Sequence, residues 1–292
     1  MSAWMEAFRD SVEQLPGTVL FMALAAMAFF ALAVFVKGLA GALAGARKAS
    51  GEVRINAVLW AIDQVTVTPT LNVIAAASGL ALHAAVVSAG LRLDPSRLWA
   101  ALGGAPTLLA VVFIGDFLGY WRHRVQHSAL LWPAHAIHHS DTQLTWFTQE
   151  RMHPIDRLGS LVDTLILGAL GFPLWALAAN VLIRHYYGSL IHVDAPWTWG
   201  RLNLVFNSPA MHRWHHARDI DGSGVNFATV FSVFDRAFGT YHQPGPCDAP
   251  LGVREDMGRG ALGQYAHPFR VWLGLDKARP AEAAGGDLTR AA

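Results

Sequence analysis

Residues 123–139 read HRVQHSALLWPAHAIHH, and this stretch decides what kind of fold the chain can have. It holds an HxxxH pattern followed by an HxxHH pattern, whose members are His123, His127, His135, His138 and His139. Residues three and four positions apart lie on one face of a helix. The spacing therefore predicts two helical segments that each present several imidazoles together.

Histidine is concentrated around this stretch, because eleven of the fourteen histidines lie between positions 123 and 216. A second HxxHH is formed by His212, His215 and His216. Neutral imidazole is a common ligand of iron, zinc and copper. Eight imidazoles in three clusters are more than one ion can hold, so the pattern predicts two metal ions.

Other interpretations of these histidines fit less well. An isolated buried histidine usually forms a hydrogen bond in a core, but two HxxHH patterns and one HxxxH so close together are too many for chance. A ferritin-like site needs paired Glu-x-x-His motifs, and only Glu150 to His153 has this form. The HExxH motif of zinc proteases is absent.

Long apolar segments surround the histidines. No charge occurs from Thr18 to Val36, a length that can cross a hydrocarbon core of about 30 Å. Further apolar segments cover about residues 70–90, 98–115 and 165–183. The last contains Gly168, Gly171 and Pro173, which predict a bent or re-entrant segment. Asp10 and Glu13 before the first segment favour a membrane helix over a cleaved signal peptide.

Basic residues predict the orientation. The loop after the first apolar segment carries four basic residues and the loop after the second carries two; they are Lys37, Arg47, Lys48 and Arg54, against Arg92 and Arg97. By the positive-inside rule, the first loop is cytoplasmic. The third segment then delivers the histidine region to the cytoplasmic face. The sequence thus predicts an all-α, polytopic membrane helical bundle with about four hydrophobic segments and a cytoplasmic, histidine-rich cap for two metals.

Composition supports a membrane protein and excludes some partners. Hydrophobic residues make up 53% of the chain and charged residues 15%, against about a quarter charged in soluble domains. The net charge of +1 gives no reason to expect nucleic acid as a partner. Three parts are expected: membrane helices over residues 1–115, a histidine-box region over 116–242, and a C-terminal tail over 243–292 with a disordered end.

The residues around the histidines form further motifs. Asp116 to His127 resembles the motif D-x-x-x-Y-x-x-H-R-x-x-H, residues 145–154 resemble T-x-x-R-x-H-P, and residues 234–241 resemble W-D-x-x-F-G-T. Together with the two HxxHH boxes, these motifs resemble the fatty acid hydroxylase/sterol desaturase superfamily of membrane di-iron enzymes, over about residues 110–242. Ala228 and Phe234 depart from the usual Gly and Trp, outside the histidine boxes.

The resemblance implies a set of site residues. The eight box histidines are expected to bind two iron ions, with His192 as an additional ligand and His153 as a ligand or a neighbour of one. Asp116 lies seven residues before His123 on the same helical face. It is therefore expected either to accept a hydrogen bond from an imidazole N–H or to be a charge at the helix end.

The resemblance also implies the activity. Two ferrous ions would bind and reduce O₂ and oxidise a C–H bond of a lipid such as a fatty acyl chain or a sterol, with hydroxylation favoured over desaturation. A GxGxxG at residues 258–263 follows no strand, and Cys247 is the single cysteine, so the chain carries no nucleotide or iron–sulfur site of its own. Electrons would come from a separate cytochrome b5-, ferredoxin- or rubredoxin-like protein.

Two other functions stay open. One is a zinc-dependent, lipid-modifying enzyme on the same scaffold. The other is a membrane protein that binds or transports metal, for which ionisable residues within the spans would be expected. Here the histidines cluster at the ends of the apolar segments instead.

Overall fold

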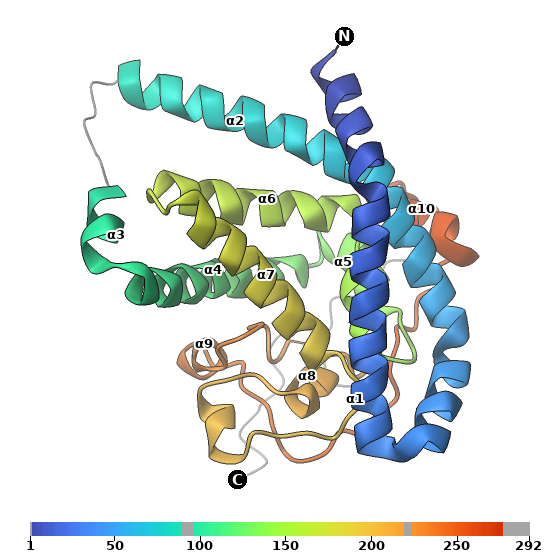
Figure 1. The fold of residues 1–292 in the computed structure, drawn as a ribbon. Helices are drawn as coiled ribbons and strands as arrows, with labels where there is room; N and C mark the ends of the chain where they lie inside the picture. Colours follow the sequence, from blue (N-terminus) through green and yellow to red (C-terminus); the bar gives the residue numbers. More distant parts are fainter. Residues whose placement is uncertain (1, 89–95, 219–223, 277–292) are drawn as a thin grey trace. The chain divides into compact units, whose positions relative to one another are not determined.

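A computed structural model describes residues 2–88, 96–218 and 224–276, without the side chains of 82–87. Every regular element in these ranges is helical (Figure 1), which confirms the predicted all-α class. The elements are α1 (Ala3–Ile62), the π-helix η1 (Asp63–Val67), α2 (Thr68–Ser88), α3 (Ser96–Leu102), α4 (Gly104–Gln126), α5 (Trp132–His139), the 3₁₀-helix η2 (Trp146–Glu150), α6 (Pro154–Ala169), α7 (Leu174–Ile191), the 3₁₀-helix η3 (Gly200–Leu204), α8 (Pro209–His215), α9 (Val233–Ala237) and α10 (Gly260–Trp272).

The chain divides into two compact units. The first comprises residues 1–115 and 157–183, and the second comprises residues 116–156 and 184–292. All the histidines predicted as ligands belong to the second unit. The end of the C-terminal tail, predicted to be disordered, lies outside the described residues.

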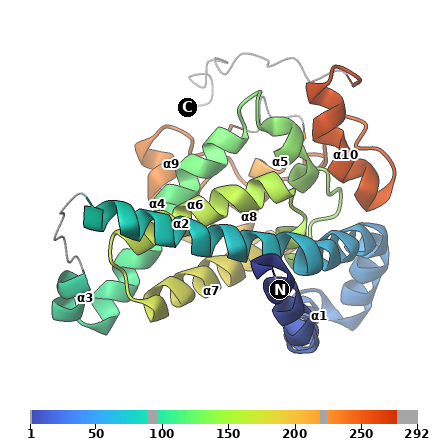
Figure 2. The same cartoon turned by 90° about the horizontal axis from the view of Figure 1, so that it is seen from above.

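In the first unit, α1 is a helix with one break. Gly38 has φ +71° and ψ 166°, a conformation that is essentially restricted to glycine, and it follows Lys37, where the first apolar segment ends. Figure 1 shows the two arms of α1 turning back on each other at this point, with the second arm continuing through η1 into α2. Figure 2 looks nearly along the first arm, and α2 runs across it. The Trp4 indole donates to Thr70 Oγ1 at 3.0 Å and joins the start of α1 to α2.

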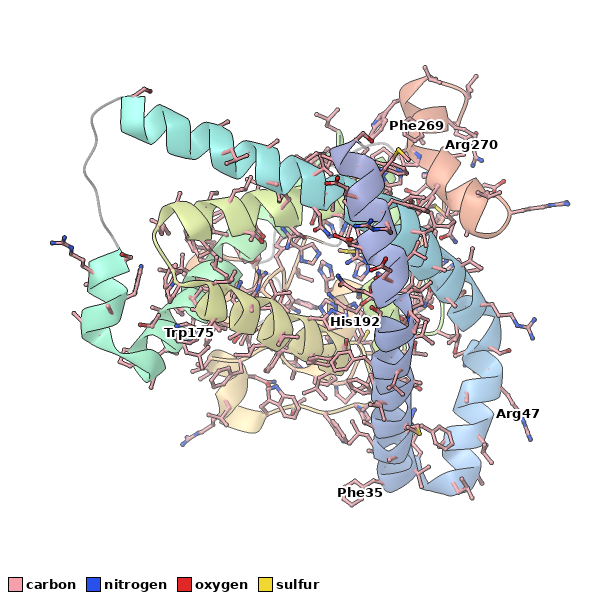
Figure 3. The ribbon with its side chains drawn as sticks, turned by 45° about the horizontal axis from the view of Figure 1, so that its top comes forward. Phe35, Arg47, Trp175, His192, Phe269 and Arg270 are labelled. Carbon is pink, nitrogen blue, oxygen red and sulfur yellow. The ribbon has the colours of Figure 1, made fainter. Side chains whose placement is uncertain are left out.

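Within the residues that the structure describes, two helical stretches are long and apolar enough to cross a membrane, namely Ala3–Ala81 and Gly104–Gln126. On the first arm of α1 many large apolar side chains are exposed, and Phe35 is 86% exposed near the turn, where Figure 3 shows it pointing away from the chain. Exposed apolar surface of this extent is typical of contact with lipid or a partner. These features support a membrane protein.

The last apolar segment is interrupted, as its glycines and proline predict. Helix α6 ends at Ala169 and α7 begins at Leu174, with Gly171 between them at φ +76°. Trp99 holds this turn, because its indole donates to the Leu170 carbonyl at 2.8 Å and its ring stacks on Phe172 with centroids 3.8 Å apart.

Candidate metal centre

Nine histidines form two groups in the second unit. Within each group the candidate ligand atoms all lie within 4.8 Å of one another. The five-histidine group consists of His123, His127, His135, His139 and His215. The four-histidine group consists of His138, His192, His212 and His216. Each group can hold a metal ion, and neither contains a carboxylate or a thiolate.

Each HxxHH motif contributes its i,i+4 pair to one group and its i+3 residue to the other. On α5, the i,i+4 pair His135 and His139 belongs to the five-histidine group, and the residue between them belongs to the other. The α8 motif reverses the assignment, since His212 and His216 join the four-histidine group and His215 joins the five. An i,i+4 pair lies on one helical face, and a residue at i+3 is rotated away from it enough to reach the neighbouring group.

Short helices with proline at their start carry these motifs. Pro133 and Pro209 each occupy the first turn of their helix, where a missing backbone N–H costs nothing. The Ser208 hydroxyl caps α8 and accepts from the Met211 backbone N–H at 3.4 Å. Helix α4 supplies His123 in its last turn, and the His127 backbone N–H bonds to the His123 carbonyl just beyond it.

Backbone carbonyls fix the orientation of several imidazoles through Nδ1. The acceptors are Phe227 O for His123 (2.8 Å), Val225 O for His215 (2.7 Å), Gly188 O for His192 (2.6 Å) and Arg151 O for His138 (3.3 Å). A carbonyl only accepts, so each of these rings carries its proton on Nδ1. A neutral ring of this kind presents the lone pair of Nε2 to the centre.

These lone pairs face one another at short distances. His138 Nε2 lies 3.2 Å from His192 Nε2, and both rings donate through Nδ1. His192 Nε2 in turn lies 2.9 Å from His212 Nε2. Two lone pairs that point at each other repel unless a cation lies between them. Metal–nitrogen bonds of about 2.1 Å would place neighbouring ligand nitrogens about 3.0–3.4 Å apart, so the spacing fits a shared ion.

Burial keeps the imidazoles neutral. It lowers the pKa of His192 to about 4 and that of His215 to about 3, although the hydrogen bonds to Gly188 and Val225 raise both. Burial, and then the neighbouring imidazoles, also lower the pKa of His139 and His216 well below the ordinary value. These rings therefore need no proton loss at neutral pH before they bind a metal.

Two further Nε2 atoms also indicate that a cation binds here. In the described part of the chain, the Nε2 atoms of His139 and His215 are buried without a hydrogen-bond partner. A buried polar atom without a partner costs free energy. A metal bond would satisfy both atoms, and an all-imidazole set suits iron, zinc or copper. Figure 3 shows His192 inside the second unit, among the nitrogen atoms of this cluster.

A buried carboxylate lies directly behind the five-histidine group. Asp156 Oδ2 is 3.4 Å from His135 Nδ1, and its Oδ1 accepts from Gln126 Nε2 at 2.8 Å. A carboxylate behind an imidazole fixes the ring and makes its other nitrogen a better ligand. Asp156 was not predicted from the sequence. Its place two residues after Pro154, in the first turn of an apolar helix, marks an unusual carboxylate but does not show that it faces His135.

Two more buried carboxylates hold the loop that supplies carbonyls to the rings. Asp235 accepts from the backbone N–H groups of Phe227 (2.7 Å) and Ala228 (3.1 Å). Asp116 accepts from three backbone N–H groups of the same loop, those of Thr229, Val230 and Phe231, and pairs with Arg184 at 3.4 Å. Asp116 therefore contacts backbone amides and a guanidinium, and it supports the rings indirectly.

The structure does not bring every predicted residue into the centre. His153 belongs to neither group; it packs its ring against Tyr265 and Phe269 and accepts from the Ile155 backbone N–H at 3.2 Å. Its assignment as a ligand stays a prediction. His192, by contrast, belongs to the four-histidine group together with His138 from the second box.

Comparison with known proteins agrees with this chemistry. Residues 108–240 match the family model described as fatty acid hydroxylase. The chain is 33% identical to an ornithine lipid hydroxylase of Rhizobium tropici over 159 residues, 53% of this chain and 48% of that protein. It is 32% identical to a human alkylglycerol monooxygenase over 167 residues (55% and 36%), and 33% identical to a Delta(7)-sterol 5(6)-desaturase of Gibberella zeae over 132 residues (44% and 36%). No solved structure matches the chain significantly.

The centre thus has the ligand set of a histidine-rich metal site. Residues 108–240 match the fatty acid hydroxylase family model, and the relatives include a hydroxylase and a sterol desaturase, in agreement with the resemblance seen in the sequence. The matched stretch spans about half or less of the relatives' own length. The relatives' names support an oxidoreductase.

Asp156→Asn is expected to weaken metal binding. The asparagine can accept from only one of Gln126 and His135, and it would direct its NH₂ at the other donor. Loss of such a carboxylate typically costs about 10- to 100-fold in metal affinity. Competition with a chelator of known affinity would measure the change. Asp194→Asn, an exposed carboxylate paired with Arg213, serves as the control; equal loss in both variants would contradict the role of Asp156.

Proposed function

We propose that this protein is a membrane-bound di-iron oxygenase that hydroxylates a lipid, with desaturation as the alternative outcome of the same chemistry. The observation that carries the proposal is the pair of histidine groups whose Nε2 lone pairs converge at about 3 Å. Each group would hold one ion. Iron is proposed because zinc has no redox chemistry and the relatives are named as hydroxylase, monooxygenase and desaturase.

The protein's own contribution is to hold the rings, keep them neutral and exclude water. Bound iron would supply the activation of O₂. The balanced reaction joins RH, O₂, two electrons and two protons to give ROH and water. All the rings in the four-histidine group are buried, so the site is shielded from bulk water.

A lipid substrate fits the apolar surfaces of the chain. Besides the exposed apolar side chains of α1, the second unit has an open groove of about 550 Å³, lined by Tyr187, Thr198, Trp199, Leu202 and Phe206. Sites for small molecules commonly have volumes of about 300–1,000 Å³ and mostly apolar walls. Tyr187 lies on α7, the helix that ends next to His192. A fatty acyl chain or a sterol is the proposed substrate class.

The two electrons would come from a separate cytochrome b5-, ferredoxin- or rubredoxin-like protein. Four basic residues flank the histidine boxes, and we propose that they receive an acidic carrier; they are Arg122, Arg124, Arg213 and Arg218. We also propose four membrane segments, with the histidine region on the cytoplasmic face.

Metal content provides a direct test. Protein purified without oxygen is expected to hold two iron ions per chain. His215→Ala should remove the ion of the five-histidine group, and His212→Ala that of the four-histidine group, because each loses one ligand that points inward. His242→Ala, outside both groups, should keep both ions. One ion or none in active protein would contradict the proposal; zinc in overexpressed protein would not, because it outranks ferrous iron for such ligands.

Labelled oxygen tests the reaction itself. Metal-loaded protein, candidate lipids, ¹⁸O₂ and a reductase–carrier pair are expected to give an alcohol that contains one ¹⁸O atom, detected by mass spectrometry. Unlabelled alkene would instead assign the protein as a desaturase. Turnover without O₂ would eliminate an oxygenase.

Thiol labelling tests the orientation. A cysteine in place of the exposed Arg236, in a Cys247→Ser background, is expected to be shielded from impermeant reagents in intact cells and labelled after lysis. A cysteine in place of the exposed Arg97, near the start of α3 and predicted to lie on the opposite face of the membrane, is the matched control and should react in intact cells. The reverse pattern would place the histidine region outside.

A further inference from the structure

A small cavity lies directly beside the imidazoles in the second unit. It measures about 20 Å³, more than the roughly 10–15 Å³ that one water molecule needs. Its lining contains both aromatic and charged side chains; the residues are Trp132, His139, His216, Ala217, Arg218, Gly252, Val253, Arg254 and Glu255. It shares no lining residue with the apolar groove.

One histidine from each group lines the cavity. His139 comes from the five-histidine group and His216 from the four-histidine group. Their rings are stacked, with centroids 4.4 Å apart and an interplanar angle of 23°. A small molecule in the cavity would therefore lie beside ligands of both metals.

Arg218 supplies the feature that indicates a ligand. Its Nε is buried and has no hydrogen-bond partner, although the residue lines the cavity. Two backbone contacts hold Ala217 and Arg218 in place, because the Arg218 N–H donates to the Pro250 carbonyl at 2.8 Å and Ala217 pairs with Leu251. A buried cationic donor without an acceptor is costly, and an anion in the cavity would satisfy it.

The other charges of the lining favour the same ligand. Arg218 and Arg254 outnumber the one carboxylate, that of Glu255. This carboxylate already accepts from the Trp132 indole at 2.9 Å. The Trp132 ring in turn lies 5.2 Å from the ring of His139 and closes one side of the cavity. The imidazoles of His139 and His216 complete the lining. Without metal they are neutral hydrogen-bond acceptors, and with metal bound they would lie beside its positive charge.

We propose that this cavity is a binding site for a small anion at the metal centre, and that Arg218 is the residue that stabilises the anion. The inference rests on the proposed function, since the metals give the site most of its positive charge. The cavity would then be a polar entrance to the metal centre, separate from the apolar groove. Small oxygen anions such as hydroxide belong to the class of ligand that the site would take.

Azide is a suitable probe, because its binding to the ferric protein can be followed by absorption without any turnover. Arg218→Gln removes the charge and the Nε donor. Loss of a charged hydrogen bond is expected to raise the azide Kd about tenfold or more. Val253→Phe should fill the cavity and abolish binding. Arg236→Gln, an exposed arginine outside the cavity, is the matched control and should bind azide as the unmodified protein does.

Metal content is measured on every sample, which separates the two proposals. Absence of bound metal in the unmodified protein would overturn the proposed function, and this inference with it. If metal is bound, an azide Kd unchanged by both Arg218→Gln and Val253→Phe would overturn the anion site alone. Failure of the metal-loaded, unmodified protein to bind azide would do the same. If Arg218→Gln loses its metal, the azide Kd of Val253→Phe still tests the anion site, because this variant keeps Arg218 in place.

Discussion

The repulsion between converging imidazole lone pairs is the constraint on which the rest of the second unit depends. The Nε2 atoms of His138 and His192 lie 3.2 Å apart. The proton of each ring is on Nδ1, where it is donated to a carbonyl oxygen on the other side of the ring. Only a cation makes this arrangement favourable. Metal binding is therefore expected to contribute to the folding free energy of this unit, since the rings, the carbonyls and the buried carboxylates all belong to the same network.

The negative charges of the site are placed behind the rings. Asp156 lies beside His135, whereas Asp235 and Asp116 hold the loop whose carbonyls orient His123 and His215. No carboxylate belongs to either histidine group. Neutral ligands would leave the full charge of any bound metal in the centre. A more cationic centre attracts anions and electron-rich ligands, which is the physical basis for an anion site beside Arg218.

Under the proposed function, two kinds of reactant would reach the centre, and the second unit offers a separate surface to each. An alkyl chain is stabilised by apolar contact and needs no polar partner, and the walls of the groove beside Tyr187 provide this. Protons, water and small anions need polar groups, and these line the cavity beside His139 and His216. The groove and the cavity share no lining residue, so a lipid and a small anion would bind at separate places.

The sequence by itself determined the helical class, the superfamily and the concentration of ligands, because these depend on local spacing. An i,i+4 pair of imidazoles shares a helical face wherever the helix lies, and apolar length is a property of the segment alone. The interrupted segment near Gly171 also followed from local chemistry. The predicted loop after Lys37 was wrong, because the chain breaks only at Gly38 and places Arg47, Lys48 and Arg54 on the second arm of α1. Tertiary structure decided which histidine joins which group, and it left His153 outside both. It also decided that Asp156 and Asp235 support the rings and that Arg218 borders the cavity. These contacts join residues from different elements of the chain, so no local pattern of spacing or hydropathy could specify them.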